Sequence, residues 1–329
     1  MNKPLDPARR TSRGLPFFLS LLLFVSLSAL ALYLLLGSHA EGLSERSEQQ
    51  ARNSGHLLLF AALAISACNT AVLGFGPIKF FRLLAGTALL ATAAGLLTEF
   101  LQGFVGRQPS VLDCLLDLIG ALLGCTLYAA FAKRIRPGNI LFVSNRQIHF
   151  IFIALVLASL VTLLPLWKAL LDEHRTMQQF PILADYESKI EMGRHSGNSK
   201  TAWEPGSLLV YFSAGQLANI DWLYLARDWS AYRELAIELD NRASTALALA
   251  CRIHYRAHEN NYEHHDRYTR GFTLKPGRQT LLINLEAVRN APQGRQMDMR
   301  KIASLVCFTR GLPQTRLLAF EQLRLQGMR

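Results

Sequence analysis

The chain of 329 residues has little charge, little cysteine and none of several familiar catalytic motifs. Charged residues make up 18% of it and hydrophobic residues 50%, which excludes a disordered or collagen-like chain and argues against one that is soluble throughout. The five cysteines include no Cys-x-x-Cys pair, so neither a disulfide scaffold nor a zinc site of that type is indicated. No phosphate-binding glycine loop, nucleophile elbow or internal repeat is visible, and the missing repeat argues against an alternating-access transporter.

The charge that is present is unevenly distributed. Lysine and arginine number 35 against 24 acidic residues, a net charge of +11 that in a soluble protein would suggest a nucleic-acid partner. Only 24 charged residues precede position 179, whereas the shorter remainder holds 35. The composition therefore predicts two domains, residues 1–178 and 179–329.

Long apolar runs dominate the first domain. The first run has no charged residue over about 22 positions, enough to cross a bilayer at about 1.5 Å per residue. Ser38-His39-Ala40 resembles a signal-peptide cleavage site, but the run is longer than a usual signal sequence, and we favour an anchor. We predict a membrane α-helical bundle of five transmembrane helices, at residues 15–36, 56–75, 83–101, 111–132 and 150–167.

The loops between these runs predict the orientation. About ten lysines and arginines lie on the side of the N-terminus and three on the opposite side, which places the N-terminus in the cytoplasm. After five crossings the second domain is exported. Because the remaining positive charge forms no dense run, we expect the lipid bilayer, and no nucleic acid, as a partner.

The second domain alternates apolar and polar residues, as in the run from Leu247 to Ile253. Glycine, proline and asparagine separate about eight such runs, a pattern typical of an all-β sandwich of two antiparallel sheets. Cys251 and Cys307 could pair in an oxidising compartment, but both lie in apolar strands where buried free thiols are common, and we favour free thiols.

A cluster of histidines lies in this domain, with acidic residues between them. Imidazoles and carboxylates are suitable metal ligands, but a solvated polar loop explains the cluster as well. We assign no metal and no other cofactor to these residues, which are His254, His258, Glu259, Glu263, His264, His265 and Asp266.

Several phrases of the second domain resemble the galactose-binding-like β-sandwiches, a jelly-roll fold found in carbohydrate-binding modules and in the complex I intermediate-associated family. They are residues 180–187, Asp228-Trp229-Ser230-Ala231-Tyr232, Asp266-Arg267-Tyr268 and the closing run 317–325. The resemblance implies sugar binding through aromatic platforms and loop polar groups. The glycan-binding candidates are Trp229, Tyr232, His258, Asp266 and Arg267.

Four ionisable residues interrupt the apolar runs of the first domain: His56, Glu99, Asp113 and Asp117. Such groups are costly in a membrane and are functional candidates by default. The predicted topology brings His56, Glu99 and Asp113 to the outward end of the bundle, with Asp117 one turn deeper. Arg107, in the short loop nearby, would be their counter-charge. The alternative is that these charges only hold the helices together.

Helical spacing assigns these residues to two stripes. Small residues mark close helix contacts in membranes, so both stripes are expected to face the bundle interior, with Gly95, Gly120 and Gly124 as packing positions. One stripe contains Asp113, Asp117, Gly120 and Gly124, and the other contains Thr92, Gly95, Glu99 and Gln102.

These residues carry a second resemblance, to the VanZ family of small membrane proteins that is named for a link to glycopeptide resistance. The similar motifs, over residues 56–132, are Gly55-His56-Leu57, Gly95-x-x-x-Glu99-x-x-Gln102, Arg107 and Asp113-x-x-x-Asp117-x-x-Gly120-x-x-x-Gly124. Two positions depart from the family. Arg52-Asn53 replaces its usual Asp-Lys, and Asp117 replaces an Asn, so this acid needs a proton or a partner.

Together the two resemblances imply a protein of the bacterial inner membrane with a periplasmic domain. It would bind cell-envelope glycan, such as peptidoglycan or a lipid-linked glycan, with an outward pocket for a head group and without catalysis. The pocket residues would be His56, Glu99, Gln102, Arg107, Asp113 and Asp117. The alternative is an enzyme acting on a lipid-linked phosphate or glycan, with Glu99 and Asp113 as acid and base, drawing on His56 and Asp117 as further candidates.

Overall fold

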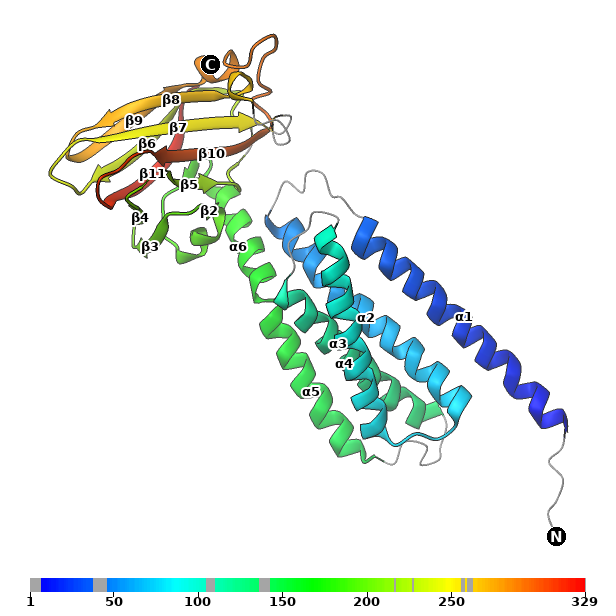
Figure 1. The fold of residues 1–329 in the computed structure, drawn as a ribbon. Coiled ribbons are helices and arrows are strands. Elements are labelled where there is room, and N and C mark those ends of the chain that lie inside the picture. Colours follow the sequence, from blue (N-terminus) through cyan, green and yellow to red (C-terminus); the bar gives the residue numbers. More distant parts are fainter. Residues whose placement is uncertain are drawn as a thin grey trace. The chain divides into compact units, whose positions relative to one another are not determined.

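The computed structural model describes residues 7–37, 46–104, 110–135, 143–215, 217–226, 228–255, 258 and 263–328. The chain divides into two compact units (Figure 1). One, the helical unit, comprises Met1–Glu41 and Gln49–Leu166, and the other, the sandwich unit, comprises Gly42–Glu48 and Trp167–Arg329. The change of unit after Leu166 comes twelve residues before the boundary that the composition predicts at 178.

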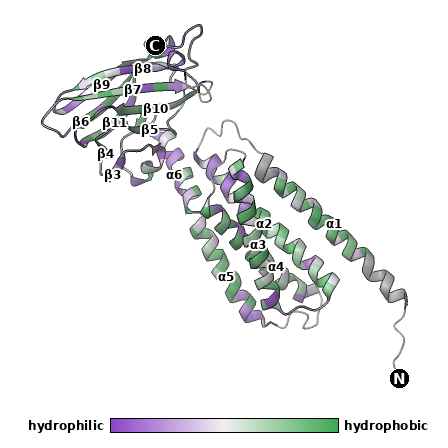
Figure 2. Ribbon diagram, in the orientation of Figure 1, coloured by the Kyte–Doolittle hydropathy of each residue, from purple (hydrophilic) through white to green (hydrophobic). Residues whose placement is uncertain are grey.

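Five helices of the described residues are long and apolar enough to cross a membrane, and their ribbons are coloured mainly as hydrophobic in Figure 2. Each overlaps one predicted run, although most extend beyond it. They are α1 (Pro7–Gly37), α2 (Arg46–Phe75), α3 (Phe80–Phe104), α4 (Val111–Ile135) and α5 (Asn145–Thr162).

The fifth predicted helix, 150–167, is wrong at its C-terminal end. Helix α5 stops at Thr162, and a separate helix, α6 (Leu164–Gln179), begins two residues later. Pro165 explains the break, because its ring prevents α5 from continuing but is tolerated in the first turn of a new helix. The start of α5 is fixed by Ser144 and Gln147, which form a capping box.

Glycines set the packing of α4 against α2. A Cβ atom at Gly120 would clash with the carbonyl oxygen of Leu57, and one at Gly124 with that of Ala61. Such a close approach of two helix backbones is what the predicted packing role of these glycines requires.

The sandwich unit contains two antiparallel sheets. One has the order β3-β4-β11-β6-β9 with β1 beside β11, and the other has the order β2-β5-β10-β7-β8. The described residues form eleven strands where about eight are predicted, because β1 and β2 are too short to show alternation. The strands are β1 (Ile182–Ala184), β2 (His195–Ser196), β3 (Lys200–Glu204), β4 (Ser207–Phe212), β5 (Ala218–Trp222), β6 (Tyr232–Asn241), β7 (Leu247–Tyr255), β8 (Tyr268–Leu274), β9 (Gly277–Asn284), β10 (Ile302–Thr309) and β11 (Arg316–Met328).

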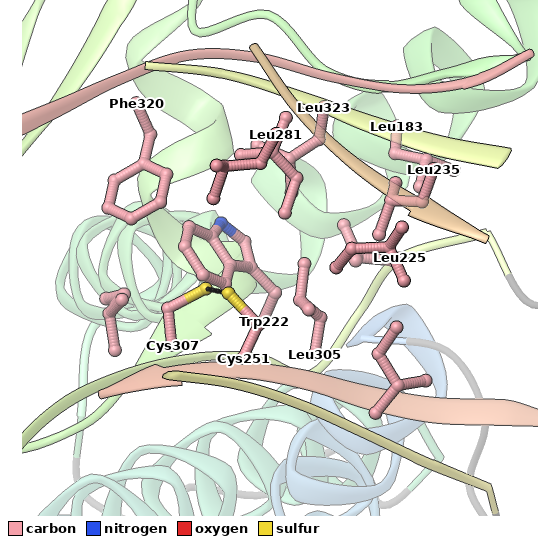
Figure 3. Close-up of a cluster of buried hydrophobic side chains, with 14 of the residues drawn as sticks. Leu183, Trp222, Leu225, Leu235, Cys251, Leu281, Leu305, Cys307, Phe320 and Leu323 are labelled. Atoms are coloured by element: carbon pink, nitrogen blue, oxygen red, sulfur yellow. Dashed lines mark hydrogen bonds between the residues drawn. The ribbon is translucent and has the colours of Figure 1, made fainter. Parts of the chain in front are cut away.

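The two sheets enclose one hydrophobic core around Trp222 (Figure 3). Its indole packs edge-on against Phe320, with ring centroids 4.9 Å apart, and donates a hydrogen bond to the Tyr186 hydroxyl at 2.7 Å. Cys251 and Cys307 face each other across β7 and β10 as free thiols with their sulfur atoms 2.8 Å apart. The preference for free thiols over a disulfide stays a prediction.

Helix α6 joins the sandwich core through a buried ion pair. Arg194, which is 2% exposed, donates to both carboxylate oxygens of Asp172 on α6, from Nε at 2.9 Å and from a terminal nitrogen at 2.8 Å. Such a doubly bonded pair is strong because both partners are charged and aligned. It explains why most of α6 belongs to the sandwich unit, which the composition did not predict.

Candidate functional site

Two of the ionisable residues predicted to converge are in direct contact. His56 of α2 and Asp117 of α4 share a hydrogen bond of 2.9 Å between Nδ1 and Oδ1, and the side chains are 7% and 1% exposed. The imidazole is the partner that an acid at position 117 needs. Gly95 of α3 leaves room for this carboxylate, since a Cβ there would lie 3.0 Å from Asp117 Oδ2.

Glu99 and Gln102 of α3 and Asp113 of α4 are buried in the same region. The Glu99 carboxylate accepts the Ser110 amide at 2.5 Å, and the Ser110 hydroxyl accepts the Asp113 amide at 3.3 Å. Ser110 thus connects the end of α3 to the start of α4. The charges of Glu99 and Asp113 are close enough to interact with each other and with His56.

We call His56, Glu99, Gln102, Asp113 and Asp117 the carboxylate cluster. It contains three acids and one imidazole, an arrangement rich in hydrogen-bond acceptors. Among the described residues, Glu99 Oε1 and Asp117 Oδ2 are buried and have no hydrogen-bond partner. Because an unpaired buried acceptor is unfavourable, the arrangement suits a ligand that carries N–H or O–H donors. Arg107, the predicted counter-charge, lies outside the described residues.

The stripe on α3 needs one correction. Thr92 is exposed, whereas Thr98 is buried with Gly95, Glu99 and Gln102. The face defined by residues 95, 98, 99 and 102 covers about one quarter of the helix surface, and Thr92 lies at its edge. Gly95 lies on this face, where a Cβ would be 3.0 Å from Asp117 Oδ2, and its packing role stays a prediction.

Two of the glycan-binding candidates are core residues. Trp229 is 0% exposed and Tyr232 is 8% exposed. The Trp229 indole donates to the Ala226 carbonyl at 2.6 Å, so its polar edge is also occupied. An aromatic platform must present a free ring face to a sugar, and the prediction that these two residues form one is wrong.

Two further candidates, His258 and Asp266, form an internal network. Asp266 accepts hydrogen bonds from His258 Nδ1, at 3.1 Å, and from Arg295, and both His258 and Asp266 are buried. These contacts hold both side chains inside the domain, and the direct glycan contact predicted for them is inconsistent with their burial.

The other histidines of the cluster have separate partners. His264 contacts Arg267 at 2.9 Å, and His265 contacts Glu263 at 3.2 Å. His254 contacts the Ser304 hydroxyl at 3.5 Å, and burial lowers its pKa to about 4. Glu259 lies outside the described residues, which contain no group of three or more side chains placed to hold a metal.

The remaining candidate, Arg267, lines a pocket of about 210 Å³ on the outer face of the five-stranded sheet. Sequence reasoning missed its neighbours Arg252, Phe308 and Arg310. A signal for Arg252 was present, because it occupies a polar position of an alternating strand and therefore points away from the core. The alternation of apolar and polar residues does not show which strands lie beside β7, so the other residues of the pocket could not be predicted.

Comparison with known proteins identifies no family. No family model matches this sequence, and no curated protein matches it significantly. Solved structures with a similar fold bear on the sandwich alone. A family 11 carbohydrate-binding module from Clostridium thermocellum is 12% identical, with a TM-score of 0.36, over 45% of this chain and 95% of that one.

Two further solved structures show similar likenesses. The agarase AgWH50C is 14% identical over 45% of this chain and 26% of its own, with a TM-score of 0.36. PfGH50B is 17% identical over 40% of this chain, with a TM-score of 0.33, and the match spans only 22% of PfGH50B. At these values the likeness names neither a ligand nor a reaction for this chain.

Proposed function

We propose that this chain is a VanZ-like, multi-pass protein of a bacterial inner membrane, with its N-terminus in the cytoplasm and its sandwich in the periplasm. In this proposal the carboxylate cluster binds the polar head group of an envelope lipid or lipid-linked glycan. The sandwich binds glycan of the cell envelope. The protein acts by binding rather than by catalysis.

The observation that carries the proposal is the carboxylate cluster. Its residues come from three apolar helices and meet in one buried place. Acids within membrane helices are costly and are functional candidates by default, so three of them are a poor means of holding helices together. Ligand binding gives a reason for their presence, since a bound donor would satisfy Glu99 Oε1 and Asp117 Oδ2.

The same cluster supports the enzymatic alternative, in which Glu99 and Asp113 act as acid and base. Both acids are buried and both contact Ser110, Glu99 through its carboxylate and Asp113 through its backbone amide, so two acids lie near each other as acid–base chemistry requires. However, Glu99 already accepts the Ser110 amide, which suits a fixed binding group better than one that must exchange a proton with substrate.

Lipid analysis tests the head-group proposal. We would extract the full chain in mild detergent and identify the co-purifying lipids by mass spectrometry. We expect one lipid class to be enriched over the total membrane extract with wild-type protein, and this enrichment to be lost in Asp113→Asn. The matched control is Ser159→Ala, which removes a buried polar group of α5 whose hydroxyl bonds only within its own helix.

Enrichment that survives in Asp113→Asn, or the same lipid profile for all three proteins and the total extract, would contradict head-group binding. To separate binding from catalysis, Glu99→Gln is compared with wild type after incubation with the enriched lipid. A chemically altered lipid that appears only with wild type would replace the binding proposal with the enzymatic one.

A further inference from the structure

The outer face of the five-stranded sheet carries a row of polar side chains. In β7, the core takes Leu249, Cys251 and Ile253, so Arg252 points outward between them. Register across the sheet pairs Arg252 with Thr269 of β8 and with Val306 of β10. Paired residues of neighbouring strands share a face, which places these side chains together outside the core.

The neighbouring pair on this face is Phe308 of β10 and Asn219 of β5. Together with the loop residues His264, Arg267 and Arg310, these side chains line the pocket of about 210 Å³. The pocket is smaller than the roughly 300–1,000 Å³ typical of drug-sized ligands, so it suits one sugar residue or one charged group.

Three arginines converge on this small pocket. Among the described residues no carboxylate lines it. Asp221 of β5 is close enough to Arg252 for their opposite charges to attract. The charges that interact with Arg267, by contrast, are the like charges of Arg252 and Arg310. Burial and these two like charges hold the pKa of Arg267 below its ordinary value. The positive charge of the pocket is therefore incompletely balanced.

The arginines also have hydrogen-bonding capacity to spare. Within the described part of the chain, Nε of Arg252 and Nε of Arg267 are buried without a hydrogen-bond partner. One terminal nitrogen of Arg267 contacts His264 Nδ1, and the Arg310 guanidinium lies over the Phe308 ring at 5.5 Å. These contacts orient two of the guanidinium groups at the pocket rim.

We propose that this arginine pocket binds the acidic group, carboxylate or phosphate, of an anionic glycan. Guanidinium groups present paired N–H donors that match both kinds of anion. Phe308 adds an apolar ring, and Asn219 and Thr269 add polar groups suited to sugar hydroxyls. The assignment rests on the proposed glycan-binding role of the sandwich and specifies the charge of the glycan.

Calorimetry on the purified full chain in detergent tests this assignment. The probes are tetragalacturonic acid, its neutral methyl ester and inorganic phosphate. We expect the acid to bind at least about tenfold more tightly than the ester, because the ester cannot form charged hydrogen bonds with arginine. Added salt weakens this binding, since the pocket is open to solvent.

Three variants test whether the pocket itself binds the acid. Arg267→Gln and Arg310→Gln are each expected to weaken acid binding about tenfold. Arg310 is exposed, so its loss leaves the fold intact even if the half-buried Arg267 proves necessary for folding. Arg242→Gln is the matched control, because this arginine pairs with Glu204 and does not line the pocket, and it should bind like wild type.

Equal binding of acid and ester, unchanged in the arginine variants, would overturn the arginine pocket but leave glycan binding by the sandwich in place. Binding of phosphate without binding of the oligosaccharide would overturn the glycan as ligand class. If a wider set of charged and neutral glycans also gives no binding, the proposed function of the sandwich fails as well.

Discussion

At the scale of single residues, the helical unit depends on the absence of side chains at its glycines. Gly120 and Gly124 bring the backbone of α4 against carbonyl oxygens of α2, while Gly86 on α3 has open space around it. Backbone contacts this close cannot be relieved by rotating a side chain, so even one methyl group requires the helices to separate.

Gly120→Ala should therefore destabilise the helical unit by about 1–3 kcal/mol, as overpacking of a close contact does, and lower its thermal midpoint in detergent by several degrees. Gly86→Ala, which adds the same methyl group where nothing lies within 4 Å, should leave the midpoint unchanged or slightly raised. A Gly120→Ala protein with the wild-type midpoint would show that α2 and α4 do not pack in this way.

The hydrogen bond between His56 and Asp117 gives a second test at this scale. Asp117→Asn keeps an acceptor for the imidazole and should retain nearly wild-type thermal stability. Asp117→Leu removes it and leaves His56 buried without this partner, at a cost of about 1–3 kcal/mol. The comparison is made by thermal unfolding in one detergent, and a leucine variant as stable as the asparagine variant would contradict the pairing.

At the scale of elements, the helices and strands with long sequence patterns could be predicted, and the very short strands could not. The alternation in β7 gave both its existence and its buried face, and the apolar runs gave the five long helices. β1 and β2 hold three and two residues and exist only because neighbouring strands pair with them. The arginine pocket was hidden for the same reason, since it depends on which strands are adjacent.

Strands β2 and β7 carry histidines that should make the sandwich sensitive to acid. Burial, assisted by the charges of Arg252, His258 and Arg267, lowers the pKa of His254 to about 4. Burial and Arg46 lower that of His195 to about 4 as well. Both pKa values lie below the unfolded value of about 6.5, so their stabilising contribution is complete above pH 6.5 and is lost as the pH falls to 4.

We expect the thermal midpoint of the sandwich to fall between pH 6.5 and 4, with each histidine contributing on the order of 1–3 kcal/mol. Burial raises the pKa of Glu191 to about 6, so this residue acts in the opposite sense, adding stability as the pH falls from 6 to 4.5. Because His254→Gln cannot take a proton, its midpoint should fall less than that of wild type. An equal fall in both proteins would contradict the role of His254.

At the scale of the whole molecule, composition predicted two parts that meet at residue 178, and the compact units of the structure change after Leu166. The composition of helix α6 is typical of neither a membrane span nor a strand. The hydrogen bonds from Arg194 to Asp172 show which unit most of this helix joins. The carboxylate cluster was predictable because ionisable residues in apolar runs are rare enough to be conspicuous. Which atoms would pair required the structure.

The uneven distribution of lysine and arginine predicts the orientation in the membrane. Alkaline phosphatase, which is active only after export, should be active when fused after Met328 and inactive when fused after Ile135 at the end of α4. Both fusions must be shown by immunoblot to accumulate equally. The opposite pattern of activity would reverse the orientation and place the sandwich in the cytoplasm.

The contact between Gly95 and Asp117 has a consequence for the evolution of this chain. A Cβ at position 95 would lie only 3.0 Å from Asp117 Oδ2. The side chains at positions 95 and 117 therefore compete for the same space between α3 and α4. A lineage that enlarges residue 95 must shorten residue 117 or move the helices apart. Related sequences should therefore show the two positions changing together, with glycine retained wherever an acid or amide occupies the partner position.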